Sequence, residues 1–217
     1  MSIRGMSSVR AAFGVFAGGL LLSASVASSH IGNEAGPPGA EAGITATTAA
    51  AVKEAFRSAM VSLRSIEEPA SPALRQQGQS MSPAEISNSN ASLMAVGSRL
   101  ISEHFAGQAA STEALLLRSA VASSLSPGPN AALVGSGISN IDFTSLDVTA
   151  AEAVVHATVS VWTELRLRSL TGSTQTLGRW TTVTRSSKEA FVDTMLLQGG
   201  KWVVVTNSWQ YVPGYAP

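Results

Sequence analysis

The stretch that decides the fold is AVVHATVSVWTELRLR, residues Ala153–Arg168. Its odd positions from 155 to 161 hold only Val or Ala, whereas its even positions include His156, Thr158 and Ser160. Because side chains alternate between the two faces of a strand, this pattern predicts one long strand with a buried face and a mostly wet face. Such a strand is typical of an antiparallel sheet that is covered on one side.

Further strand patterns lie on both sides of this stretch. Residues 141–148 alternate with a one-residue slip in phase, which predicts a bulge. Residues 177–198 form a long strand region that is interrupted by Ser-Ser-Lys at 186–188, read as a bulge or a turn. Gly199-Gly200 predicts a tight hairpin into a last strand over Lys201–Tyr211.

Three helical patterns precede the strands. An apolar stripe with spacings of three and four begins after Thr48 and stops before Pro69. Ser82-Pro83-Ala84-Glu85 is a capping box with proline at the first helical position, and its helix is expected to run to Gly107. A third helix is expected to start at Ser111 or Thr112. Helices followed by a meander of strands predict an α+β fold in which the helices pack on the concave face of a bent antiparallel sheet.

The expected buried positions of the three helices are Val52, Phe56, Met60, Leu63 and Ile66, then Leu93, Val96, Leu100, Ile101 and Phe105, then Leu115, Leu116, Val121 and Leu125.

The N-terminus has the three parts of a secretory signal peptide. Arg4 and Arg10 form a basic start, Ala11–Leu22 is a short apolar core, and Ser25 and Ala27 are small residues at the expected cut. We therefore expect residues 1–27 to be removed and the protein to be exported, either outside the cell or into the envelope. The alternative is a retained membrane anchor, although a spanning helix needs about 20 apolar residues.

Composition limits what the mature chain does. Residues 28–47 are small, polar and rich in Gly and Pro, which predicts a flexible linker before a single domain over residues 48–217. The 217 residues include 14 basic and 14 acidic side chains and no cysteine. Disulfides and thiolate chemistry are therefore excluded. The balanced charge argues against nucleic acid as a partner, and no membrane contact is expected after cleavage.

The C-terminal part resembles the nuclear transport factor 2-like (cystatin-like α+β cone) superfamily over about residues 82–211. The resemblance rests on the strand Ala190–Leu197, the Gly199-Gly200-Lys201 hairpin and the Trp202–Val205 strand that follows it. It implies helices that lie in the hollow of a bent sheet, and domains that often pair through the open sheet face. The chain is similar to exported actinobacterial proteins and to periplasmic domains of conjugation or type IV secretion scaffolds. The excess of Arg over Lys and the Ala/Ser bias are typical of a high-GC bacterium.

Catalytic and metal chemistry find little support in the residues. Asp142, Asp147 and Asp193 sit on predicted strands or turns, where a solvated or turn-capping role is the default. His30, His104 and His156 lack the spacing of a zinc site. Gly135-Ser136-Gly137 is read as a turn, because the third glycine and the helix of a phosphate loop are missing. We expect no catalytic residue, no cofactor and no metal.

Two aromatic features are candidate binding surfaces. Trp162 lies on the polar face of the long strand with Arg166 and Arg168, and Trp180 lies on the neighbouring strand region, a combination typical of protein interfaces. The alternative, with no role in binding, is that single aromatic rings pack on the aliphatic stems of arginine side chains. In the tail, Trp209, Tyr211 and Tyr215 are candidates for a lid over the cone, or for a frayed end or a partner-binding peptide.

The sequence therefore favours an exported, non-catalytic binding or scaffolding module, with a homodimer through the sheet face or an envelope protein as candidate partners. One alternative is a small-molecule-binding enzyme of the isomerase or cyclase type with its site inside the cone. Another is a subunit of a conjugation or secretion scaffold, held by its N-terminal segment.

Overall fold

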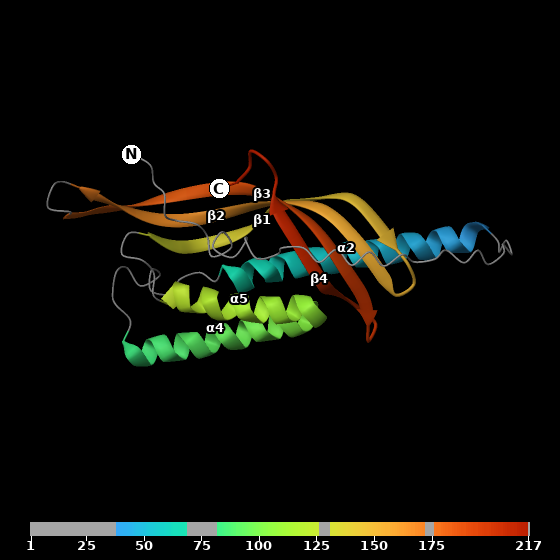
Figure 1. Ribbon diagram of the computed structural model, residues 1–217, viewed down its shortest axis with the longest axis horizontal. Helices are drawn as coiled ribbons and strands as arrows, with labels where there is room; N and C mark the ends of the chain where they lie inside the picture. Colours follow the sequence, from blue (N-terminus) through green and yellow to red (C-terminus); the bar gives the residue numbers. More distant parts are fainter. Residues whose placement is uncertain (1–37, 69–81, 126–130, 172–175, 217) are drawn as a thin grey trace.

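The computed structural model of the chain describes residues 38–68, 82–125, 131–171 and 176–216 (Figure 1). The elements in chain order are α2 (Pro38–Glu67), α4 (Pro83–His104), α5 (Gly107–Leu125), β1 (Ala131–Val148), β2 (Glu152–Thr171), β3 (Thr176–Gln198) and β4 (Lys201–Tyr211). Helices followed by strands confirm the predicted α+β class. The predicted signal peptide and residues 28–37 of the predicted linker lie outside the described residues. None of the described helices combines the length and the hydropathy needed to span a bilayer.

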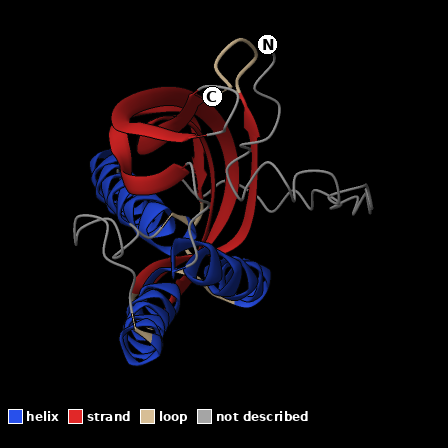
Figure 2. Cartoon of the chain, turned by 90° about the vertical axis from the view of Figure 1, so that its left-hand side faces the viewer, coloured by secondary structure: helices blue, strands red, loops and turns tan. Residues whose placement is uncertain are grey.

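The four strands form one antiparallel sheet in the order β1-β2-β3-β4. Seen end-on, the sheet curls strongly and the helices gather on one side of it (Figure 2). The alternation predicted for β2 is confirmed, because Val155, Val159 and Val161 are at most 2% exposed. Thr158 and Ser160 are only partly buried, on the opposite face.

The structure confirms one of the predicted strand irregularities and contradicts another. The predicted slip in β1 is confirmed as a register shift between Phe143 and Ser145. The expected interruption at residues 186–188 is wrong, since β3 pairs with β2 without a shift through that segment. Gly199 and Gly200 form the predicted hairpin with φ angles of 57° and 81°, a conformation that glycine adopts without steric cost.

Two helix starts differ from expectation. The helix α2 begins at Pro38, so residues 38–47, expected to be linker, are helical. This segment consists mostly of small residues and carries no apolar stripe from which a helix could be predicted. The helix α5 begins at Gly107 rather than at Ser111 or Thr112. The preceding helix α4 does begin with the predicted capping box, in which the Glu85 amide donates to Ser82 Oγ and the Ser82 amide donates to Glu85 Oε2.

The centre of the core is the apolar stripe of α2. All five predicted positions, Val52, Phe56, Met60, Leu63 and Ile66, are at most 1% exposed. The Phe56 ring makes edge contacts with Phe143 and Phe191, with ring centroids 5.6 and 6.4 Å apart. These rings connect the helix directly to β1 and β3, so α2 fills the hollow side of the sheet.

Most of the predicted buried positions of α4 and α5 face the core, since Ile101, Phe105 and Val121 are buried and Leu93 and Leu100 pack against them, but one position on each helix does not. Val96 is 47% exposed, and the buried position next to it is Gly97. On α5, Leu115 is 64% exposed whereas Leu117 is buried. Three consecutive leucines at 115–117 leave the phase of the stripe ambiguous in the sequence, and packing against α4 resolves it.

Candidate functional site

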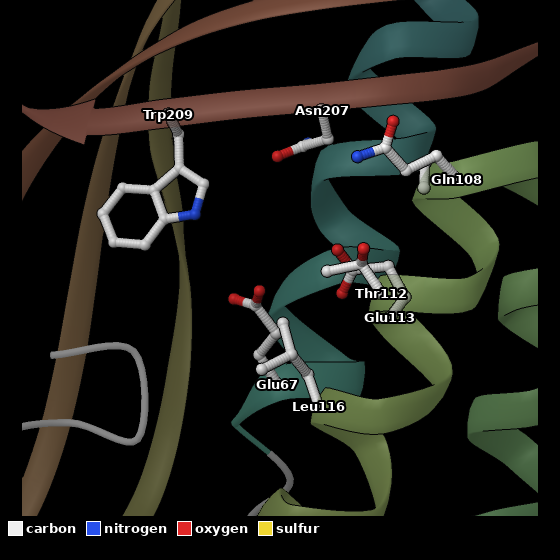
Figure 3. Close-up of a pocket in the computed structure, with 8 residues that line it drawn as sticks. Glu67, Gln108, Thr112, Glu113, Leu116, Asn207 and Trp209 are labelled. Atoms are coloured by element: carbon white, nitrogen blue, oxygen red, sulfur yellow. The ribbon is translucent and has the colours of Figure 1, made fainter. Parts of the chain in front are cut away.

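A small polar hollow of about 80 Å³ lies where the C-terminal end of α2, the first half of α5 and β4 meet (Figure 3). The residues around it are Glu67, Gln108, Ala109, Thr112, Glu113, Leu116, Asn207 and Trp209. Two carboxylates, two carboxamides, a hydroxyl and an indole therefore converge on one space. No Lys, Arg or His is among these lining residues.

The two carboxylates come from different helices. Glu113 is 2% exposed, because it occupies the core-facing stripe of α5 between Ala109 and Leu117. Glu67 is 5% exposed and extends the core-facing stripe of α2 by one turn beyond Leu63. Burying a carboxylate costs free energy unless polar partners or a cation compensate it. Two such groups therefore lie beside one hollow.

The strand side of the hollow is made by Asn207 and Trp209, alternate residues that face the helices from β4 (Figure 3). Asn207 Nδ2 donates a hydrogen bond of 3.3 Å to Asp193 Oδ2 on β3. Asp193 is fully buried, so the solvated or turn-capping role expected for it is wrong. It lies on the inward-facing side of β3 between Phe191 and Met195, both of which are buried.

A buried ion-pair network lies one turn before Glu67 on α2. Arg64 Nη2 is 2.6 Å from Glu68 Oε2, and Arg64 Nη1 is 3.4 Å from Glu189 Oε1 on β3. Thr163 on β2 donates a hydrogen bond of 3.4 Å to Glu68 Oε2. The network ties the end of α2 to two strands, so it positions the helix that carries Glu67.

The structure places Trp162, Arg166 and Trp180 on the outer face of β2 and β3, where each is partly buried. The Trp162 indole lies against the backbone of its cross-strand neighbour, since a Cβ added at Gly137 would be 2.7 Å from its Nε1. Gly135-Ser136-Gly137 is accordingly strand, and its reading as a turn is wrong. Arg166 and Trp180 are partly buried, and the side chain of Arg168 lies outside the part described. The interface stays a prediction.

The three predicted lid residues occupy different places. Trp209 lines the hollow and contacts Tyr211 edge-on, with ring centroids 5.3 Å apart. Tyr215 lies beside β3, where its carbonyl accepts a hydrogen bond from the Lys188 amide and its ring lies 4.4 Å from Lys188 Nζ. The tail thus folds back onto β3, and its role as a lid stays a prediction.

The histidines are not gathered into one place. His104 is partly buried at the end of α4, and burial lowers its pKa more than the nearby Glu103 raises it. His156 lies on the outer face of β2, and His30 lies outside the described residues. Within the described ranges, no three His, Asp or Glu side chains are grouped so that they could hold a metal ion.

Sequence reasoning missed the polar residues of the interior. Glu113 repeats at the four-residue spacing of Ala109 and Leu117, and Glu189 and Asp193 share the odd positions of β3 with Phe191. A charged residue in phase with an apolar face was therefore the available signal. Arg64 and Glu67 lie at the border of the α2 stripe, where phase alone does not decide burial.

Comparison with known proteins adds little to this geometry. No protein-family model matches the chain, and no curated protein matches it significantly. Among solved structures, the intermembrane space region of the chloroplast protein ARC6 matches with a TM-score of 0.35 and 12% identity, over 58% of this chain and 92% of that one. A Xanthomonas campestris protein assigned as a calcium/calmodulin dependent protein kinase II association domain matches with a TM-score of 0.29 and 11% identity, over 60% and 85%. Likenesses this weak carry no argument about family or function.

Proposed function

We propose that the chain is an exported domain of the nuclear transport factor 2-like type that works as a non-catalytic binding or scaffolding module in the cell envelope or outside the cell. The observation that carries this proposal is the filling of the cone. Phe56, Met60 and Leu63 occupy the hollow side of the sheet and are at most 1% exposed. An enzyme of the isomerase or cyclase type would need that space for its substrate.

The size of the polar hollow supports the same choice. Pockets for drug-sized ligands usually measure about 300–1,000 Å³, whereas this one measures about 80 Å³. A polycyclic substrate does not fit without displacing α2. The surfaces of the module, rather than its interior, are then the places where a macromolecular partner would bind.

Calorimetry with a polycyclic steroid and with benzene tests the filled cone. We expect the wild-type protein to bind neither compound. Phe56→Ala should create an apolar cavity and gain benzene binding, as engineered apolar cavities do. Val61→Ala, which truncates an exposed residue of the same helix, is the matched control and should gain nothing. Steroid binding by the wild-type protein at micromolar concentration would contradict the proposal.

Export is tested separately by intact-mass measurement of protein expressed with its own N-terminus in a high-GC actinobacterial host. We expect the mature protein to begin at Ser28 and to be recovered outside the cytoplasm. A chain that keeps Met1–Ala27 in the membrane fraction would favour the alternative, an anchored scaffold subunit.

The polar hollow favours a second candidate function, the binding of a small organic cation. Glu67 and Glu113 supply negative charge, and Trp209 turns the nitrogen-bearing edge of its indole toward the same space (Figure 3). Asn207 supplies a carboxamide on the same side as the indole. A cation of the size of methylammonium fits the space and is opposite in charge to the carboxylates.

The test of this candidate is thermal unfolding with methylammonium chloride against sodium chloride at equal ionic strength. A ligand that binds only the folded state raises Tm, and we expect Glu113→Gln to abolish the rise. Glu103→Gln, which changes an exposed carboxylate at the end of α4, should keep it. Equal shifts in both variants would attribute the effect to salt and remove this candidate.

A further inference from the structure

The strand β3 is much longer than the strand that covers its outer edge. It runs over Thr176–Gln198, but β4 pairs with it only from Glu189 to Gln198. Immediately beyond, the tail caps the edge, because the Val212 amide donates to the Lys188 carbonyl and the Lys188 amide donates to the Tyr215 carbonyl. Figure 1 shows the β2–β3 hairpin extending well past the end of β4. Among the described residues, none pairs with the side of residues 181–187 that faces away from β2.

The tail contacts show which backbone amides and carbonyls of β3 point toward this open edge. Lys188 directs both its amide and its carbonyl toward the tail, away from β2. Backbone direction alternates along a strand, so Thr182, Thr184 and Ser186 present their amides and carbonyls in the same direction. The intervening odd residues bond to β2. The open edge is therefore a direct continuation of the β3–β4 ladder.

The side chains of this edge are poor in the features that usually block strand pairing. Natural edges carry lysines, prolines, bulges or very short strands. Residues 181–187 read TTVTRSS, with one charge at Arg185 and no proline or glycine. Thr181, Thr182 and Thr184 are exposed. A register shift opposite Arg168 and Leu170 ends the regular edge at its far side.

We propose that this edge, residues 181–187 of β3, pairs with the same edge of a second copy of the chain, in antiparallel orientation across a two-fold axis. The alternation of backbone direction requires even residues to face even residues. An axis at Thr182 would place Arg185 opposite the arginine at position 179 of the second copy, which is unfavourable. An axis at Val183 places Arg185 opposite Thr181 and pairs the stretch from 181 to 185 with itself.

A second copy fits this edge better than a strand of a charged partner. The edge has a single charge, so it offers no pattern of charges that would select a foreign peptide. A two-fold axis at Val183 instead places Thr182 opposite Thr184 of the second copy and keeps the two copies of Arg185 apart. Paired threonines on facing strands are favourable neighbours. The surface buried by one short pair of strands is below that of a standard interface, so the dimer should be weak and dependent on concentration.

Sedimentation velocity over a range of protein concentrations tests the proposal. We expect the wild-type protein to shift from monomer to dimer with concentration, and Thr182→Pro to remain monomeric because proline removes an amide from the open edge. An amide that faces outward makes no bond to β2, so the monomer should tolerate this proline. Thr182→Ala, which keeps the amide, should dimerise as the wild type does. Circular dichroism of all three proteins checks that they are folded.

Two results would overturn the proposal. One is a wild-type protein that stays monomeric at the highest concentration reached. The other is a dimer that persists in folded Thr182→Pro. If that dimer is lost in Trp162→Ala, the interface lies on the sheet face instead. If Thr182→Pro does not fold, hydrogen exchange of the wild-type protein tests the proposal. Only edge pairing slows the exchange of the Thr182 and Thr184 amides as the protein concentration rises, so unchanged exchange rates would overturn it. The proposal does not depend on the proposed function, and neither steroid binding nor failed export affects it.

Discussion

Arg64 of α2 and Glu189 of β3 form an ion pair inside the protein, with Nη1 and Oε1 3.4 Å apart and with side chains only 6% and 2% exposed. The same guanidinium holds Glu68 through its other nitrogen. One cation thus compensates two carboxylates of the interior and fixes the end of α2 against the sheet.

Removal of this cation should be strongly destabilising. We expect Arg64→Leu to lower the free energy of unfolding by about 3–5 kcal/mol, because two buried carboxylates lose their countercharge. Arg99→Leu is the control, since Arg99 pairs with Glu103 at an exposed site and such pairs contribute about 1 kcal/mol or less. Urea unfolding measures both values. Similar losses in the two variants would show that the buried pair contributes no more than a surface pair.

The close contact between α4 and α5 depends on Gly97. A Cβ at this position would lie 2.4 Å from Leu117 Cδ1, and Leu117 is itself buried. We expect Gly97→Ala to cost about 1–3 kcal/mol through overpacking, although alanine is the better helix former. Ser98→Ala, at an exposed position of the same helix, controls for helix propensity. In the double variant with Leu117→Ala, the cost of Gly97→Ala should largely disappear, and a strictly additive loss would contradict the steric explanation.

Two glycines of β1 lie at different distances from the Trp162 ring, so their substitutions form a matched pair. A Cβ at Gly137 would lie 2.7 Å from Trp162 Nε1, whereas a Cβ at Gly135 would lie 3.8 Å from the ring, an ordinary contact. Gly137→Ala should therefore displace the indole, change the near-ultraviolet circular dichroism and destabilise the fold by about 1–3 kcal/mol. Gly135→Ala should leave the spectrum unchanged. If both alanines behave alike, the indole does not pack on Gly137.

The capping box of α4 makes stability depend on pH. The pKa of Glu85 is lowered chiefly by the hydrogen bond from the Ser82 amide and then by the one from the Ser82 hydroxyl. A carboxylate with a lowered pKa stabilises the fold fully above its ordinary pKa of about 4.3, and this contribution is lost as the pH falls through the lowered value.

Urea unfolding between pH 2 and pH 6 measures this effect. We expect Glu85→Gln to remove this part of the acid dependence, and Ser98→Ala, elsewhere on α4, to retain it. An unchanged profile in Glu85→Gln would show that the carboxylate does not hold its capping position in solution.

The sheet could be predicted largely from local patterns. Strict alternation in β2, the phase slip in β1 and the paired glycines before β4 each depend on a few neighbouring residues, and the structure confirms them. The α2 stripe is similar, because five apolar residues recur at helical spacing without ambiguity. Where the pattern was weak, as at residues 38–47, the predicted start of the helix was wrong. Where it permitted several phases, as at Leu115–Leu117, the choice of the buried leucine was wrong.

The candidate site could not be predicted in the same way. Glu67 and Glu113 are 46 positions apart in the sequence, and only the packing of α2 against α5 brings them to one hollow. Asp193 was expected to be solvated or to cap a turn, since aspartate is rarely buried. Its burial becomes understandable only with Asn207 of β4 beside it.

The sequence by itself determined the class of the fold, the burial of alternate residues in β2 and the apolar stripe of α2, because these depend on periodicity within single elements. Tertiary structure alone decided which charges entered the interior and what opposed them, as with Arg64 and Glu189, which are 125 positions apart. The physical reason is that burial of a charge is tolerated only when a partner from another element compensates its lost hydration, and no local pattern specifies that partner.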